Sequence, residues 1–285
     1  MSQFKQRWVV IFALLLLVGC AAVYFMVDVP AEASLASGDK KVKCRDYASP
    51  TIIDTGVPLN VAVWNIYKQQ LDGWDTELST LSKRNALILL QEAQSKPRLS
   101  QYIEREGWHS NQAYAFAVNG EIAGVMTLSD AIPKRVCAYT KVEPYLRLPK
   151  SALYSQFALS NGESLSVVNI HSINFTFGTD EYRAQLRALV QAASGLDGPL
   201  IVAGDLNTWS DERLELVSEE LHHLGLAEVE FRRDERLKVF GHALDHLFYR
   251  GVELKASSSQ STSASDHAFI EASFVFMLHD ERDSL

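Results

Sequence analysis

The chain contains few cysteines and no internal repeat. Three cysteines occur among its 285 residues, at positions 20, 44 and 137. Cys44 and Cys137 show no recognisable spacing, so they could pair in an oxidising compartment or remain two free thiols. About 227 residues follow the first 58, enough for one large domain with a sizeable core.

The chain also lacks an excess of basic residues. Its net charge is −8, and residues 46–285 hold 21 Lys/Arg against 32 Asp/Glu. A domain that binds duplex DNA tightly usually presents a basic face. The acidity therefore argues against tight non-specific DNA binding, although a local basic patch would escape such a count.

One long uncharged run stands near the N-terminus, at Trp8–Val27, directly after Lys5 and Arg7. As a helix it would be about 30 Å long, one hydrocarbon thickness. We expect residues 1–27 to be a membrane anchor or signal segment, with residues 8–27 in an inner membrane. A lipoprotein processed at Cys20 is the alternative.

The flanking charges bear on which side of that membrane the domain lies. Lys5 and Arg7 favour a cytoplasmic N-terminus and hence a periplasmic domain. The basic cluster between residues 40 and 45 favours the opposite orientation, with a cytoplasmic domain. Residues 28–58, which contain three prolines, are predicted to be a linker, and residues 59–285 the folded domain.

Strands and helices alternate through the folded domain. Strands are expected at 59–64, 86–90, 114–118, 123–128, 135–142, 152–159, 164–170, 200–203, 244–249 and 268–276, and helices at 72–84, 97–107, 179–193 and after Ser210. Strands outnumber helices, and hairpins mix with crossovers. The pattern predicts an α/β sandwich with mixed sheets.

Polar side chains gather at the ends of these strands. They are Asn65, Glu92, His171, Asn174, Asp205, Asn207, Asp245, Asp266 and His267. Singly, such residues more often form turns or helix caps. Jointly they supply hard oxygen ligands for a divalent cation, amides for a phosphate and imidazoles for a proton. Open α/β sheets build their sites at the carboxyl ends of strands, so we expect one site there.

The ordered set resembles the endonuclease/exonuclease/phosphatase superfamily. The matching motifs run from Val63-Trp64-Asn65-Ile66 through Gly204-Asp205-Leu206-Asn207 to Ser265-Asp266-His267. Seven such motifs in family order are specific, although any one is weak. Val63–Gln70, Leu148–Leu153 and Phe248–Gly251 resemble, more narrowly, the bacterial YafD group.

The resemblance implies an α/β four-layer sandwich, with two mixed sheets face to face and helices outside. It implies that Glu92 binds Mg²⁺ (or Mn²⁺), with Asn65 beside it and Asp266 near the metal. Asp205 would position or deprotonate the attacking water, and Asn207 would hold the phosphate. Asp245 would pair with His267, while His171 and Asn174 would contact the phosphate or the leaving group.

The expected function is therefore metal-dependent phosphoester hydrolysis by direct attack of water. The substrate would be a phosphodiester, either nucleic acid or a phospholipid or its headgroup. A non-catalytic, membrane-anchored binding protein that retains the fold is the alternative. The sequence implies no oligomeric state.

Overall fold

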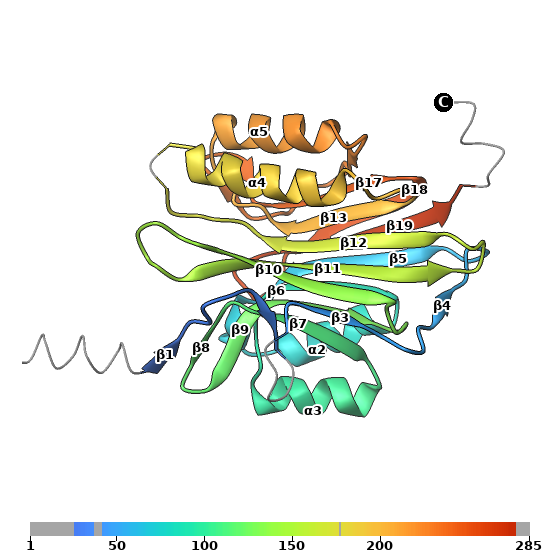
Figure 1. Cartoon of the computed structure of the whole chain (residues 1–285), viewed down its shortest axis with the longest axis horizontal. Coiled ribbons are helices and arrows are strands. Elements are labelled where there is room, and N and C mark those ends of the chain that lie inside the picture. The colour runs from blue at the N-terminus through green and yellow to red at the C-terminus, as the bar shows by residue number, and fades with distance from the viewer. Residues whose placement is uncertain (1–25, 37–41, 177, 278–285) are drawn as a thin grey trace, which may run out of the picture.

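The computed structural model of the chain describes residues 26–36, 42–176 and 178–277. Two mixed sheets pack face to face, and two pairs of helices cover their outer faces (Figure 1). This is the α/β sandwich that the pattern of elements predicts, with the four layers that the family resemblance implies.

The first sheet has nine strands. In spatial order they are β1 (Val27–Asp28), β8 (Phe116–Val118), β9 (Glu121–Ser129), β6 (Leu87–Gln94), β5 (Leu59–Asn65), β19 (Phe269–Phe276) and β18 (Val252–Gln260), while β7 (His109–Tyr114) joins β9 and β2 (Ser34–Leu35) joins β7. β5 and β6 are parallel, so their carboxyl ends lie at the same edge.

The second sheet has eight strands. Their order is β14 (Ala227–Glu228), β17 (Asp245–Arg250), β13 (Leu200–Asp205), β12 (Ser164–His171), β11 (Pro149–Leu159), β10 (Arg135–Val142) and β3 (Cys44–Asp46), with β4 (Ile52–Ile53) beside β11. β12 and β13 are parallel and also end together. A separate hairpin joins β15 (Lys238–Val239) to β16 (His242–Ala243).

The helices follow the parallel strands as crossovers. α2 (Trp74–Ser82) and α3 (Pro97–Glu106) cover the first sheet, and α4 (Asp180–Ala193) and α5 (Asp211–His222) cover the second. A 3₁₀ helix, η1 (Tyr67–Gln69), follows β5. The Ser210 hydroxyl accepts a hydrogen bond from the Arg213 backbone N–H and so caps the start of α5.

Three apolar layers hold the sandwich together. Residues such as Val61, Phe157 and Ile201 fill the space between the sheets. Trp74 packs with other α2 and α3 residues on the first sheet, and Tyr182 with α4 and α5 residues on the second. Burial of this kind is the dominant stabilising term of such a fold.

Residues 28–58 differ from the predicted linker. Within the described part of this segment, short strands pair with both sheets: β2 with β7, β3 with β10 and β4 with β11. Cys44 and Cys137 lie opposite each other in the β3–β10 pair and form a disulfide. Strands of two or three residues carry no readable periodicity, so the prolines and polar residues dominated the prediction.

The predicted membrane segment falls mostly outside the described residues, because residues 1–25 are not among them. Within residues 26–36, 42–176 and 178–277, no helix has the length and apolar character needed to cross a membrane.

Candidate active site

The two parallel strand pairs place their polar ends in one buried cluster. Asn65 closes β5, and Asp205 closes β13 directly opposite His171, the last residue of β12. The Asn65 amide donates to Asp205 Oδ2 across the interface between the sheets, at 3.0 Å. The structure therefore brings together the carboxyl ends of the parallel strands of both sheets, as the sequence predicts.

Asp205 is the centre of this cluster and is only 2% exposed. Its Oδ1 accepts the Asn207 backbone N–H at 3.0 Å, and its Oδ2 lies 3.3 Å from His171 Nε2. Burial raises the pKa of Asp205 to about 6, an effect that the positive charge of His267 opposes. A carboxylate with a raised pKa, held by several donors, suits the binding of a water molecule and its proton.

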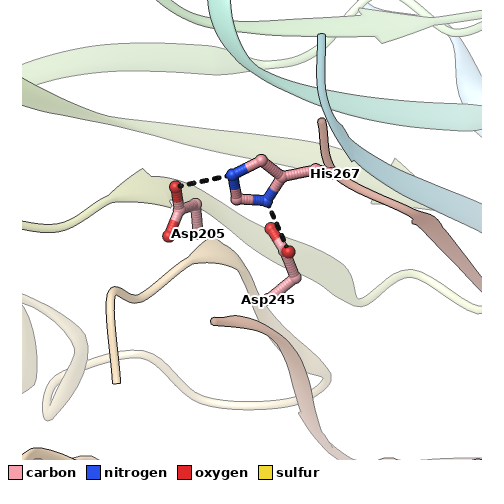
Figure 2. Close-up of side chains that lie close together, drawn as sticks. All are labelled: Asp205, Asp245 and His267. Atoms are coloured by element: carbon pink, nitrogen blue, oxygen red, sulfur yellow. Dashed lines mark hydrogen bonds and ion pairs between the residues drawn. The ribbon is translucent and has the colours of Figure 1, made fainter. Parts of the chain in front are cut away.

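His267 and Asp245 form a buried pair beside Asp205 (Figure 2). His267 Nδ1 lies 2.7 Å from Asp245 Oδ2, and its Nε2 lies 3.9 Å from Asp205 Oδ2. Burial alone would lower the pKa of His267, but the carboxylates of Asp245, Asp205 and Asp266 outweigh it and raise the pKa to about 10. His267 is therefore a cation at neutral pH, with Nε2 turned toward the cluster.

His171, in contrast, is neutral at neutral pH. Its burial, reinforced by the charges of Lys150, His267 and Lys68, lowers its pKa well below the usual value. The Lys150 ammonium lies 2.7 Å from His171 Nε2 and donates to it. Burial lowers the pKa of Lys150 as well, although Asp205 and two glutamates oppose that shift.

Glu92 lies on β6 at a bulge, where the pairing with β9 shifts register between Leu90 and Ala93. It adopts a positive φ of 52°, which an unstrained strand does not need. The bulge redirects its side chain, and Glu92 pairs with the Lys68 ammonium. Lys68 comes from η1, directly after Asn65 and its strand.

Asn207 and Asn174 line a cleft of about 630 Å³ next to this cluster. The Asn207 side chain donates to the Ser172 carbonyl at 2.9 Å. The Asn174 side chain instead accepts from the Trp209 indole N–H at 2.9 Å, so the structure places it on the cleft wall rather than in the cluster.

Asp266 stands apart from its neighbours in sequence because its side chain is exposed. Ser265 is buried, donates to the Asn65 carbonyl at 2.6 Å and accepts from the His267 backbone N–H at 3.1 Å. Ser265 thereby fixes the His267 segment against the end of β5. Asp266 contributes charge that raises the His267 pKa.

Sequence reasoning gave little or no weight to several residues that the structure places here. Lys150 is half-buried and donates to His171. Arg213 is 1% exposed and donates to the carbonyls of Ile173 and Asn207 at 2.8 and 3.0 Å. Single basic residues form no readable motif, so no sequence signal could have found Arg213.

A buried amide pair also joins the two sheets behind the site. The Gln91 side chain donates to Asn169 Oδ1 at 2.8 Å, and the Asn169 amide donates to the carbonyls of Leu90 and Met126. These bonds satisfy groups that burial would otherwise penalise, and they fix the register between β6 and β12. The neighbours of Asn65, Glu92 and His171 are thus held rigidly.

The site offers carboxylates of the kind that bind a hard divalent cation. The carboxylates of Glu92, Asp205 and Asp266 are oxygen ligands of the kind that Mg²⁺ and Mn²⁺ take. A positive charge, the Lys68 ammonium, already pairs with Glu92. Asp205, Asp245 and His267 also offer ligand atoms within 4.8 Å of one another. That second group is less suitable, because Asp245 already pairs with the cationic His267 and a metal takes neutral imidazole.

Known proteins share sequence with most of this chain. The model of the Endonuclease/Exonuclease/phosphatase family matches residues 62–267. A UPF0294 protein of Vibrio cholerae is 42% identical over 269 residues, which cover 92% of this chain and 96% of that protein.

Solved structures of low sequence identity share the fold. D. rerio TDP2 complexed with single-strand DNA product has a TM-score of 0.53 at 18% identity, covering 76% of this chain and 98% of that one. The mannosyl-6-phosphatase of Bacteroides thetaiotaomicron has a TM-score of 0.56 at 13% identity, covering 76% and 100%. At such identities the likeness establishes the fold alone.

Proposed function

Because the chain belongs to the endonuclease/exonuclease/phosphatase family, we propose that it hydrolyses phosphodiesters by direct attack of water, with Mg²⁺ or Mn²⁺ as cofactor. The observation that carries the proposal is the buried cluster around Asp205. We term this cluster the ring; its members are Asn65, His171, Asp205, Asn207, Asp245 and His267. The Asp205 carboxylate with its raised pKa lies beside the cationic His267 and accepts hydrogen bonds from the Asn65 side-chain amide and the Asn207 backbone N–H. Such an arrangement can stabilise the charge that develops on a phosphate.

Each residue of the ring has a proposed role. Asp205 orients the water and accepts its proton while the water oxygen bonds to phosphorus. The ester P–O bond breaks, and a proton goes to the leaving oxygen, giving an alcohol and a phosphomonoester. His267, kept cationic by Asp245, donates through Nε2 to a phosphate oxygen. Asn207 holds another oxygen, with Asn174 on the cleft wall beside it.

The metal would be held by Glu92, with Asn65 beside it and Asp266 nearby. When bound, it would neutralise charge on the phosphate oxygens and polarise the ester. Lys68 pairs with Oε2 of Glu92, so it would compete with the metal for this carboxylate. Lys150 donates to His171, which lies beside Asp205, and its ammonium would meet the phosphate or the leaving group.

Hydrolysis of bis-p-nitrophenyl phosphate tests this proposal. The wild-type protein should turn it over with Mg²⁺ or Mn²⁺ and stop when EDTA is added. Glu92→Gln should lose activity by about a hundredfold or more. Glu104→Gln, which removes an exposed glutamate from α3, is the matched control and should retain it. No turnover by the wild type with either metal would contradict the proposal and favour a binding role.

The disulfide between Cys44 and Cys137 supports a location in an oxidising compartment. We therefore also propose that the domain is periplasmic and is tethered to the inner membrane through residues 8–27. A fusion reporter placed after residue 277 tests this: activity of a reporter that works only in the cytoplasm would contradict it.

A further inference from the structure

Large apolar side chains stand exposed around the mouth of the cleft beside Asn207. They are Tyr145, Leu146, Phe175 and Phe240, with 55%, 54%, 54% and 85% of their surface exposed, and we term them the apolar rim. Three separate loops supply them: the β10–β11 loop, the segment after β12 and the β15–β16 turn. Single exposed apolar residues are ordinary, but a cluster at one cleft indicates a binding surface.

Phe240 is the most informative member of the rim. The β15–β16 hairpin turns through Phe240 and Gly241, with φ values of 51° and 93°. Two-residue turns with both φ values positive favour Asn-Gly, because a bulky side chain is strained there. Phe240 is nevertheless 85% exposed, so it recovers little of this strain through burial within the described chain.

The rim is also held in place from beneath. The Trp209 ring contacts the Phe240 ring at 6.4 Å between centroids, and its indole N–H donates to Asn174. The Arg213 guanidinium lies 4.4 Å from the Trp209 ring centroid. The cleft therefore has a rigid floor that connects the exposed rim to Asn207 and the ring around Asp205.

The position of the rim favours a lipid surface as its partner. In Figure 1, the chain enters the described structure at β1, at the same end of the long axis as the β10–β11 loop and the carboxyl end of β12. The sequence directly before β1 is the uncharged run Trp8–Val27. A chain tethered by that run would turn this end, and the cleft, toward the bilayer.

The net charge of the domain disfavours nucleic acid as the partner. Binding to nucleic acid draws its affinity from basic residues along the phosphates. Residues 46–285 hold 21 Lys/Arg against 32 Asp/Glu, and the rim mixes aromatic side chains with the aliphatic Leu146. Side chains of this kind insert into the boundary between headgroups and acyl chains.

We propose that the apolar rim docks on a bilayer and that the substrate is a phospholipid whose phosphodiester reaches Asn207 from that surface. This inference rests on the proposed phosphodiesterase function. The rim takes the apolar part of the lipid at the cleft mouth, and the ring around Asp205 takes the phosphate. Water then cleaves one phosphodiester bond to an alcohol and a phosphomonoester.

Full-length protein in nanodiscs of phosphatidylethanolamine and phosphatidylglycerol tests the proposal. Phosphate-containing products are measured with Mg²⁺, in parallel with bis-p-nitrophenyl phosphate in solution. Leu146→Ser and Phe240→Asn should each lower lipid hydrolysis by about tenfold or more. Both should leave hydrolysis of the soluble ester within about twofold, because neither residue belongs to the ring.

Phe240→Asn separates a loss of lipid hydrolysis from a loss of folded protein. Asparagine suits the positive φ of this turn, so this variant should melt at the same or a higher temperature while it loses lipid hydrolysis. Ile52→Asn is the control, since Ile52 is 62% exposed on β4 at the other end of the molecule. It should hydrolyse lipid like the wild type.

The possible failures are distinguishable. If the wild type hydrolyses the soluble ester but not the lipid, or if the rim variants hydrolyse lipid normally, the docking proposal is wrong and the proposed function stands. Hydrolysis of a single-stranded oligonucleotide that depends on the rim would likewise overturn it in favour of a nucleic-acid substrate. If neither lipid nor soluble ester is hydrolysed, both proposals fail.

Discussion

Gly204 should be one of the least replaceable residues of the protein. It lies in β13 next to Asp205, opposite Ile170 of β12, with a φ of 146°. A Cβ at this position would lie 1.8 Å from the Ile170 carbonyl oxygen and 2.9 Å from its carbon. Both are backbone atoms, so no side-chain rotation can relieve the contact.

The expected cost of Gly204→Ala follows from this geometry. The oxygen and the Cβ must separate by about 1.2 Å to reach the 3.0 Å that real Cβ contacts require. Such a shift weakens the β12–β13 hydrogen bonds, at about 0.5–1.5 kcal/mol each. The backbone conformation adds about 1–3 kcal/mol for a non-glycine residue. The unfolding free energy should therefore fall by about 3–5 kcal/mol.

Urea unfolding followed by circular dichroism measures this loss. Phosphodiesterase activity should fall with it, because β12 carries His171, now 3.3 Å from Asp205. Gly195→Ala is the matched control: its Cβ would meet no atom within 4 Å, so stability should be unchanged or slightly higher. A Gly204→Ala protein as stable and as active as the wild type would refute the reasoning.

Three further perturbations have defined outcomes. Replacing Cys44 and Cys137 by serine opens a cross-link spanning 93 residues and should cost about 2–5 kcal/mol by urea unfolding. Arg213→Met leaves buried carbonyls without donors and should cost about 3 kcal/mol, with loss of activity. Burial raises the pKa of Glu228, but His246 and Arg236 together outweigh burial through their hydrogen bonds and charges, and the pKa lies below its usual value. Glu228→Gln should therefore cost about 1 kcal/mol at pH 7 and nothing once the pH falls below that lowered pKa.

Much of the layered fold was predictable, because its central strands are short, apolar and bounded by turns. β5, β6, β12 and β13 all read as buried strands with a polar residue at the carboxyl end. That feature brings His171 and Asp205 together, since parallel neighbours end at the same edge. Asn65 ends a strand of the other sheet and meets Asp205 because the two sheets pack face to face. The pairing of Asp245 with His267 came from the family resemblance instead, and the geometry agrees with it.

Edge strands and isolated charges were not predictable. β18 reads as polar, because an edge strand buries few side chains, here Val252 and Ser259. β2, β3 and β4 are too short to show a period, and they gain their structure only by pairing with longer strands. Glu92 reaches the site through a β-bulge, and the local sequence does not predict a bulge there.

The same holds for the lysines of the site. Lys68 and Lys150 fall within stretches that resemble the YafD group, but nothing in those stretches assigns either lysine to the site, where the structure places both near carboxylates. Lys68 is positioned by η1 and Lys150 by the start of β11. Tertiary packing sets the place of both elements. Reasoning from spacing along the chain has no access to such contacts.

The most direct test of the central claim is the kcat/KM of Asp205→Asn for bis-p-nitrophenyl phosphate with Mg²⁺, compared with the wild type. Asparagine keeps the shape of the side chain but cannot accept a proton from water, so kcat/KM should fall by about 10²–10⁴-fold without loss of folded structure. His109→Gln, which removes an exposed histidine from β7, should remain fully active. Equal kcat/KM for Asp205→Asn and wild type would contradict a site built around Asp205.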